Sequence, residues 1–313
     1  MKFRLFLVAA LFVPNLWAQA THQVFATNEG SQDISVIDGA SDEVVATLKD
    51  VGKPRGLTLC PNDKRLYVTN QKDSQLLVID TLTQKVTHRV GLGESPEAVY
   101  CSPDGKLVAV SNEGSNSVSF ISTTELKEVF SIPVKGKNPE HSVFSPDGRL
   151  MLVSAEEADQ VDVIDVVQRK QIGAIQVGER PRGIAFTPDG KRAFVAVESA
   201  SLLVVIDMSQ LKVLEKLQVG QRTNGLLMHP NGKVVFVTNG GDATVSVVDV
   251  QSLKVLAQVP VGQRPWNMSI NPDGSKLYVA AGRSHAVSVV DAVNYKPLKN
   301  IAVGRLPWGT AAN

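Results

Sequence analysis

The sequence predicts an all-β protein, a seven-bladed β-propeller with four strands in each blade. Three independent markers recur every 42 or 43 residues and predict this fold together. The first is the proline of a Pro-Asp-Gly-like turn, at Pro61, Pro103, Pro146, Pro188, Pro230 and Pro272. The second is the aspartate of an Ile-Asp or Val-Asp pair, at Asp38, Asp80, Asp165, Asp207, Asp249 and Asp291, with Ser122 in the missing place. The third stands seven residues before each turn proline, at Pro54, Pro96, Pro139, Pro181, Thr223 and Pro265, and recurs at Pro307.

The repeat from residue 182 to residue 219 shows the elements of one blade in order. It contains four strand signals, at residues 182–187, 192–197, 201–207 and 212–219. Val, Ile, Phe and Leu dominate these short runs, and turn residues bound them, as is typical of strands. No segment carries a 3.6-residue apolar pattern over three turns, so the sequence does not favour helices.

The two ends of the chain are expected to close the ring. Seven second strands can be counted, reading VFATN, LYVTN, VAVSN, MLVSA, FVAVE, VFVTN and LYVAA. The first of them opens the repeat region, whereas residues 307–311 read as a first strand. We therefore expect the C-terminal segment to supply the innermost strand of the N-terminal blade, which leaves no free sheet edge. Residues 21–313 are then predicted to form a single domain.

Residues 1–20 have the pattern of a secretory signal peptide. Lys2 and Arg4 precede an apolar run at residues 5–13, and Ala18-Gln19-Ala20 fits a small-x-small cleavage site. Cleavage near Ala20 predicts a periplasmic or secreted protein. No other apolar run approaches membrane length, so we expect no membrane span, and we expect a monomer.

Charge and cysteine content narrow the possible partners. Without residues 1–20 the chain has 30 basic and 31 acidic side chains, which argues against nucleic acid as a partner. An exported chain permits a disulfide. For Cys60 and Cys101 the sequence leaves open a bridge or two buried thiols.

Two of the second strands carry a family resemblance. Leu66–Asn70 reads LYVTN and Val235–Asn239 reads VFVTN, and Ser-Val-Ile-Asp or Ser-Val-Val-Asp closes several third strands. These motifs resemble the YVTN family of bacterial β-propellers, from about His22 to Asn313. Within that family the chain looks most like the exported propellers associated with pyrroloquinoline-quinone-dependent (PQQ-dependent) alcohol catabolism. The resemblance implies a propeller fold and an accessory role in periplasmic alcohol oxidation.

One face of the ring, which we call the top, is expected to carry the functional residues. The Gly-x-x-Pro connections and the loops after the second strands lie on this face. The residue after each marker enters the innermost strand at the mouth of the central channel. These residues differ from blade to blade: Arg55, Glu97, Glu140, Arg182, Asn224, Trp266 and Trp308. Together with His141, Arg264 and Asn267 they form the predicted ligand-binding site, because a purely structural position would repeat one residue type.

The charges on the top face are expected to separate. The third and fourth blades carry an acidic set: Glu97, Glu113, Glu140, Glu156 and Glu157. The later blades carry a basic set: Arg180, Arg182, Arg222, Arg264 and Arg305. A rim of salt bridges between the two sets is the alternative. Trp266 and Trp308 are expected either to form an apolar wall of the site or to plug the channel.

The preferred interpretation is an exported accessory binding protein linked to PQQ-dependent alcohol oxidation. Its top face would hold a small anionic or planar molecule, or a periplasmic protein, without a cofactor and without a catalytic residue. The alternative is a metal-assisted hydrolase or lactonase-like enzyme that uses Glu97, Glu140 and His141, since one imidazole and two carboxylates can bind a divalent ion. A third interpretation is a protein-docking scaffold. The sequence has no Gly-x-Ser-x-Gly elbow and no serine in the channel ring, which disfavours a serine nucleophile.

Overall fold

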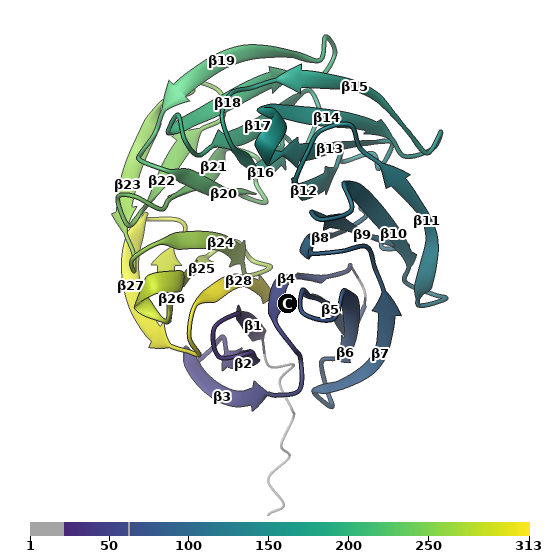
Figure 1. Cartoon of the computed structure of the whole chain (residues 1–313). Helices are drawn as coiled ribbons and strands as arrows, with labels where there is room; N and C mark the ends of the chain where they lie inside the picture. The colour runs from purple at the N-terminus through teal and green to yellow at the C-terminus, as the bar shows by residue number, and fades with distance from the viewer. Residues whose placement is uncertain (1–21, 62) are drawn as a thin grey trace, which may run out of the picture.

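The computed structural model describes residues 22–61 and 63–313, which form a ring of seven four-stranded antiparallel sheets (Figure 1). The predicted seven-bladed β-propeller is therefore confirmed. The predicted signal peptide, residues 1–20, lies outside the described residues. We number the blades along the chain, so that blade 1 contains β28 and β1–β3, blade 2 contains β4–β7, and each following blade takes the next four strands.

Each blade has the same order of strands from the channel outward. The innermost strands are β4 (Pro54–Leu59), β8 (Pro96–Cys101), β12 (Pro139–Phe144), β16 (Pro181–Phe186), β20 (Thr223–Met228), β24 (Pro265–Ile270) and β28 (Pro307–Ala312). The second strands are β1 (Gln23–Asn28), β5 (Arg65–Asn70), β9 (Leu107–Asn112), β13 (Leu150–Ala155), β17 (Arg192–Val197), β21 (Val234–Asn239) and β25 (Lys276–Ala281). Each marker residue is therefore the first residue of an innermost strand.

The third and fourth strands complete the blades toward the rim. The third strands are β2 (Asp33–Asp38), β6 (Gln75–Asp80), β10 (Ser117–Ser122), β14 (Gln160–Asp165), β18 (Leu202–Asp207), β22 (Thr244–Asp249) and β26 (Ala286–Asp291). The outer strands are β3 (Glu43–Leu48), β7 (Lys85–Gly91), β11 (Lys127–Pro133), β15 (Lys170–Gln176), β19 (Lys212–Gln218), β23 (Val255–Pro260) and β27 (Lys296–Ala302). Two short 3₁₀ turns, η1 (Glu156–Ala158) and η2 (Gly282–Ser284), follow β13 and β25.

The ring closes as the sequence predicts. β28 pairs antiparallel with β1, with Val24 opposite Ala312 and Ala26 opposite Thr310. In Figure 1 the yellow C-terminal strand lies beside the purple N-terminal blade. No helix within residues 22–61 and 63–313 is long and apolar enough to cross a membrane.

The hydrophobic core lies between neighbouring blades. One cluster joins Leu152 and Val163 of blade 4 to Ile184 and Val195 of blade 5. Both faces of a second or third strand contact an adjacent blade, so these strands are buried over consecutive residues, as in β17. The outer strand β19 is mostly exposed. This explains why the middle strands are continuous apolar runs rather than alternating ones.

The repeated turns have the structural roles that their residues predict. The Oδ1 atom of Asp80 accepts hydrogen bonds from the backbone N–H groups of Leu82 and Thr83, at 3.1 and 2.7 Å. In the Pro-Asp-Gly turns, Gly105 and Gly190 have φ values of +71° and +67°, which glycine adopts without a steric penalty. These turns shape the bottom face, opposite the predicted site.

The two cysteines form a disulfide. Cys60 follows β4 of blade 2 and Cys101 ends β8 of blade 3, with their Cα atoms 5.4 Å apart. The bridge therefore joins neighbouring blades at their innermost strands. It decides between the two states that the sequence left open, and it is a bond that persists in oxidising compartments.

Removal of this disulfide is expected to destabilise the propeller. The bridge closes a loop with a sequence separation of 41 residues. Loop-closure entropy for such a length corresponds to roughly 4 kcal/mol at 25 °C. The double variant Cys60→Ser/Cys101→Ser should show this loss in the free energy of unfolding by denaturant, whereas reductant should leave the variant unchanged. Equal stability of the variant and the oxidised parent would contradict the prediction.

Candidate functional site

A cavity of about 220 Å³ occupies the upper end of the central channel. Nine of the ten predicted site residues line it: Arg55, Glu97, Glu140, Arg182, Asn224, Arg264, Trp266, Asn267 and Trp308. Three further residues line it as well: Glu113, Glu156 and Arg180. The volume lies below the roughly 300–1,000 Å³ of pockets for drug-sized ligands. The cavity therefore suits a small molecule.

Two backbone positions of the repeat direct side chains into this mouth, the first in every blade and the second in blades 5 and 7. One is the second residue of the innermost strand, as in Glu97, Glu140 and Arg182. The other is the residue before the strand, where Arg180 and Arg264 have φ values of +58° and +55°. This left-handed conformation is uncommon for a residue other than glycine. It turns the chain sharply into the strand, and the carbonyl group of each arginine accepts a backbone hydrogen bond from the loop after the second strand.

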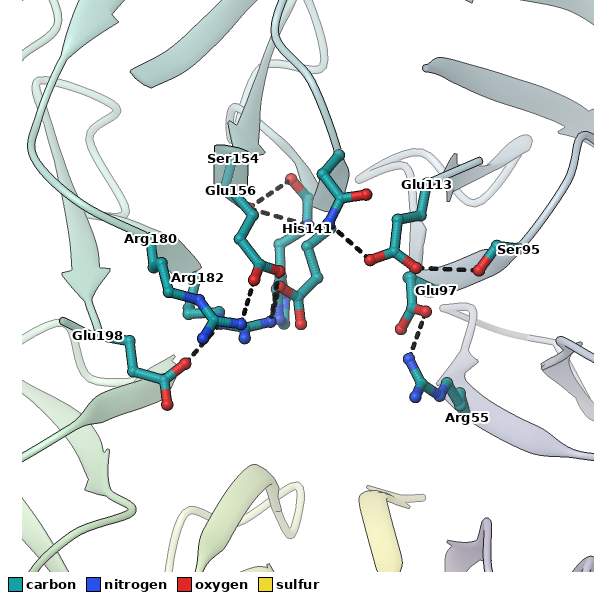
Figure 2. Close-up of polar contacts among 12 residues, drawn as sticks. Arg55, Ser95, Glu97, Glu113, His141, Ser154, Glu156, Arg180, Arg182 and Glu198 are labelled. Carbon is teal, nitrogen blue, oxygen red and sulfur yellow. Dashed lines mark hydrogen bonds and ion pairs between the residues drawn. The ribbon is translucent and has the colours of Figure 1, made fainter. Parts of the chain in front are cut away.

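A hydrogen bond from the Arg55 guanidinium to the Glu97 carboxyl group forms one side of the mouth (Figure 2). Arg55 also reaches Glu29, with 3.2 Å between Nη2 and Oε1. The side-chain amide of Gln71 donates to Oε1 of Glu97 at 2.7 Å. Oε2 of Glu97 is buried and has no hydrogen-bond partner among the described residues. Glu97 is thus a deeply buried carboxyl group with one oxygen unsatisfied by protein.

Glu198 is the centre of a second cluster. Its Oε1 lies 2.8 Å from Nη2 of Arg222 and 2.8 Å from Nη2 of Arg264, and its Oε2 lies 2.8 Å from Nε of Arg182. The Glu198 side chain is only 2% exposed. Arg182 and Arg264 line the cavity, whereas Glu198 lies behind them. Glu198 is therefore a positioning residue for these arginines.

Arg182 connects this cluster to the acidic side of the mouth. Its Nη1 forms an ion pair with Glu140 and lies 3.1 Å from Oε2 of Glu156, and Arg180 pairs with the other oxygen of Glu156. Figure 2 shows these side chains converging on one side of the channel, across from Glu97 and Arg55. The acidic and basic sets lie in the blades that the sequence predicts. Ion pairs join them across neighbouring blades, so the rim is also salt-bridged, as in the alternative.

The three best-defined carboxyl groups have different acidities. Burial raises the pKa of Glu97 to about 8, against the opposing charge of Arg55 and with the help of Glu140 and Glu113. Burial, with the nearby charge of Glu140, also raises the pKa of Glu156. Burial would raise the pKa of Glu198 too, but the charges of Arg182 and Arg264 outweigh it and lower that pKa to about 2. The site therefore combines neutral and charged carboxyl groups at neutral pH.

The pKa values of Arg55 and Glu97 are both raised, and the two shifts depend on opposite charge states of Glu97. Burial opposes the charge of Arg55, but the Glu97 carboxylate outweighs it and raises the pKa of Arg55, which requires an ionised Glu97. Burial decides the state of Glu97 and raises its pKa. Its side chain is 1% exposed against 20% for Arg55, and its Oε2 lacks a partner. The Arg55 guanidinium is charged beside either form of Glu97.

An aromatic layer closes the channel below the cavity. Trp308 of blade 1 stacks on His141 of blade 4, with ring centroids 6.2 Å apart and an interplanar angle of 15°. The rings of Trp266 and Trp308 meet edge to face at 88°. Trp308 is 4% exposed. Trp308 thus fits the predicted plug of the channel, whereas Trp266 packs under the guanidinium of Arg264, which lies 5.8 Å from its ring.

His141 is the one predicted site residue that does not line the cavity. Its Nδ1 lies 2.6 Å from the hydroxyl of Tyr100, and its ring is buried. Burial and the charge of Arg182 lower the pKa of His141 to about 3, so the ring is neutral at neutral pH.

The proposed metal ligands do not form a metal site. Glu97 and Glu140 are each paired with an arginine, and His141 is bonded to Tyr100. Within the described residues no three His, Cys, Asp or Glu side chains are placed to hold a metal ion. The carboxyl groups of the mouth therefore bind arginines and form a network of charged side chains.

Two important residues, Glu156 and Glu198, are not among the predicted ligand-binding residues. Glu156 and Glu198 each follow a second strand directly, at the same position of the repeat. One sequence signal could have identified them. Each is an acidic residue in the loop after a second strand, and the next blade has an arginine just before its innermost strand. Such a pairing places the carboxylate beside the arginine of the next blade.

Comparison with protein families identifies a relationship that the sequence motifs did not reveal. The family model described as "Lactonase, 7-bladed beta-propeller" matches residues 74–172 and 167–296. The chain belongs to this family. The interpretation as a non-enzymatic accessory binding protein is therefore wrong, and the lactonase-like alternative is the better one. The findings support the propeller, but not the YVTN label or the link to PQQ-dependent alcohol oxidation.

Solved structures with the same fold are only distantly related in sequence. A functionally unknown protein from Desulfotomaculum acetoxidans DSM 771 has a TM-score of 0.83 at 18% identity, over 93% of this chain and 99% of that chain. The Pseudomonas aeruginosa periplasmic gluconolactonase PpgL has a TM-score of 0.79 at 20% identity, over 94% and 99%. Kuenenia stuttgartiensis hydrazine synthase has a TM-score of 0.75 at 23% identity, over 84% and 90%. Comparison with curated protein sequences gives no match.

Proposed function

We propose that the protein is a hydrolase that opens small lactones in the mouth cavity. The observation that carries the proposal is the presence of two carboxyl groups with raised pKa values, Glu97 and Glu156, in one small cavity that the Arg182 guanidinium also lines. Figure 2 shows Glu97 and Glu156 on opposite sides of the mouth. A neutral acid facing a charged carboxylate is an arrangement suited to general acid–base catalysis. Membership of the lactonase propeller family supports the same reaction.

The lining of the cavity favours a polar substrate. Four arginines, four glutamates, two asparagines and two tryptophans line the cavity, and they leave little apolar wall for an alkyl group. Asn224 and Asn267 can exchange hydrogen bonds with hydroxyl groups, and Trp266 can lie against the face of a ring. The similar fold of a periplasmic gluconolactonase supports a hydroxylated sugar lactone.

The first step is attack of water on the lactone carbonyl carbon. Glu156, ionised above its pKa, takes a proton from the water molecule as its oxygen bonds to that carbon. The carbonyl π electrons move to the carbonyl oxygen. Arg182 uses Nη1 and Nε for its carboxylate partners, and Nη2 has no protein partner among the described residues. We assign Nη2 to the developing oxyanion, which a fixed cation stabilises without reorganisation.

The second step is cleavage of the ring carbon–oxygen bond. The oxyanion electrons re-form the carbonyl double bond as the ring oxygen leaves. Neutral Glu97 gives its proton to this oxygen, which becomes a hydroxyl group of the product. The new carboxylic acid ionises, and its carboxylate lies among arginines. The proton on Glu156 passes to solvent and Glu97 takes one up, so the net reaction adds one water molecule to the lactone.

A direct assay tests the proposal. The purified protein should open glucono-δ-lactone with a kcat of about 1–10³ s⁻¹, measured by proton release and corrected for spontaneous hydrolysis. A chelator should not lower the rate, because the mouth carboxylates are paired with arginines. δ-Valerolactone, which lacks hydroxyl groups, serves as the comparison and should show a higher KM. Rates equal to the spontaneous rate for both lactones would overturn the proposal.

A further inference from the structure

A second cavity lies directly below the mouth cavity in the same channel. It has a volume of about 250 Å³ and shares only Trp308 and Asn267 with the cavity above. Its lining comes from later residues of the innermost strands, including Leu57, Val99, Leu226, Met268 and Ile270. We call this cavity the lower chamber. The mouth is charged, whereas these five side chains give the lower chamber apolar walls.

Trp308 is held rigidly between the two cavities. It stacks on His141 of blade 4, and the ring of Trp266 lies at 88° to it with 6.4 Å between the ring centroids. His141 is itself fixed by its contact with the hydroxyl of Tyr100. A buried aromatic ring with partners on two sides is a permanent floor of the mouth rather than a mobile lid.

We propose that Trp308 is a specificity-determining residue that limits substrates to lactones without an alkyl tail. This inference rests on the proposed function and deepens it. A tail on the ring cannot extend upward without meeting the charged rim, and Trp308 blocks the way down. Removal of the indole joins the mouth to the lower chamber. The joined channel then accepts a lactone whose polar ring lies among the arginines and whose tail lies between Leu226 and Met268.

The experiment compares the parent with Trp308→Ala on γ-lactones that differ only in tail length: γ-butyrolactone, γ-hexalactone, γ-octalactone and γ-decalactone. In the parent, KM should stay level or rise with the tail. In Trp308→Ala, KM should fall by up to about fourfold for each methylene that enters the chamber, which corresponds to about 0.8 kcal/mol per CH₂. The same tail-length dependence in both proteins would overturn the inference.

Two further variants separate the chamber from a general disturbance of the fold. Leu226→Trp in the Trp308→Ala background refills the lower chamber and should abolish the preference for long tails. Trp308→Phe keeps an aromatic floor and should show an intermediate preference at a melting temperature near that of the parent. A preference that survives Leu226→Trp would place the tail elsewhere and contradict the inference.

Failure of the proposed function gives a different result. In that case none of the lactones is opened by any variant. The floor is then tested by calorimetric binding of butyrate, hexanoate and octanoate, whose carboxylates suit the arginines. Affinity that rises with chain length in Trp308→Ala but not in the parent supports the floor without any catalysis. No rise in Trp308→Ala overturns it.

Discussion

Replacement of Glu97 by glutamine should lower kcat for lactone opening by about 10²–10⁴-fold, the usual contribution of a general acid. Glutamine preserves the size of the side chain, and its amide oxygen still accepts a hydrogen bond from Arg55. It cannot give a proton to the departing ring oxygen. KM should change little, because the substitution removes proton transfer and keeps the shape of the mouth. Steady-state kinetics on glucono-δ-lactone measure both constants.

The pH profile distinguishes a catalytic acid from a structural carboxyl group. Glu97 is protonated below its pKa of about 8, so the rate of the parent should fall as the pH rises through about 8. The rate should also fall at acidic pH, where Glu156 takes up a proton at a pKa raised above 4.5. In Glu97→Gln the alkaline limb should disappear from the residual activity, while the acidic limb remains.

Stability gives an independent control for this variant. A carboxyl group whose pKa is raised in the folded state costs free energy when it ionises, so glutamine should leave the melting temperature at pH 9 unchanged or higher. Glu157→Gln, at an exposed neighbour of Glu156 on the same face, should keep the parent rate and both limbs. Parent-like kinetics for Glu97→Gln would remove Glu97 from the mechanism and leave the acid unassigned.

The fold could be predicted from the sequence because its signals are local and repeated. A turn proline, a turn aspartate and a strand-entry proline each act within a few residues, and their common period of 42 or 43 residues fixes the number of blades. Ring closure followed from the same count. The innermost-strand position also identified most of the cavity lining, because each strand enters at the mouth.

The pairing of charges could not be predicted in the same way. An arginine side chain is long enough to cross from one blade to another, so the order of charges along the chain does not give their partners. Arg264 of blade 7 binds Glu198 of blade 5, at a sequence separation of 66. His141 follows the lining residue Glu140, yet its ring lies against Trp308 and Tyr100 and is not part of the cavity lining. The sequence therefore predicts which side chains are candidates for the site, but not their partners or their protonation states.

Replacement of Glu198 by alanine should lower the free energy of unfolding by about 3–5 kcal/mol, the range for loss of one member of a buried ion pair. Three arginines lose their shared acceptor, and two of them, Arg182 and Arg264, have side chains that are only 11% and 12% exposed. Their charges then repel one another, and only Arg182 keeps other carboxylate partners among the described residues, Glu140 and Glu156. Urea unfolding at neutral pH measures the loss.

The pH dependence of this loss follows from the sign of the pKa shift. The pKa of Glu198 is lowered from 4.5 to about 2, so its stabilising contribution is complete above about 4.5 and disappears as the pH falls toward 2. The difference in stability between the parent and Glu198→Ala should therefore shrink over that range. Glu198→Gln keeps an acceptor oxygen but removes the charge, so its free energy of unfolding should lie between those of the parent and Glu198→Ala. Parent-like stability of Glu198→Ala at pH 7 would mean that solvent replaces the carboxylate, and that the arginines of the mouth are held by their other contacts.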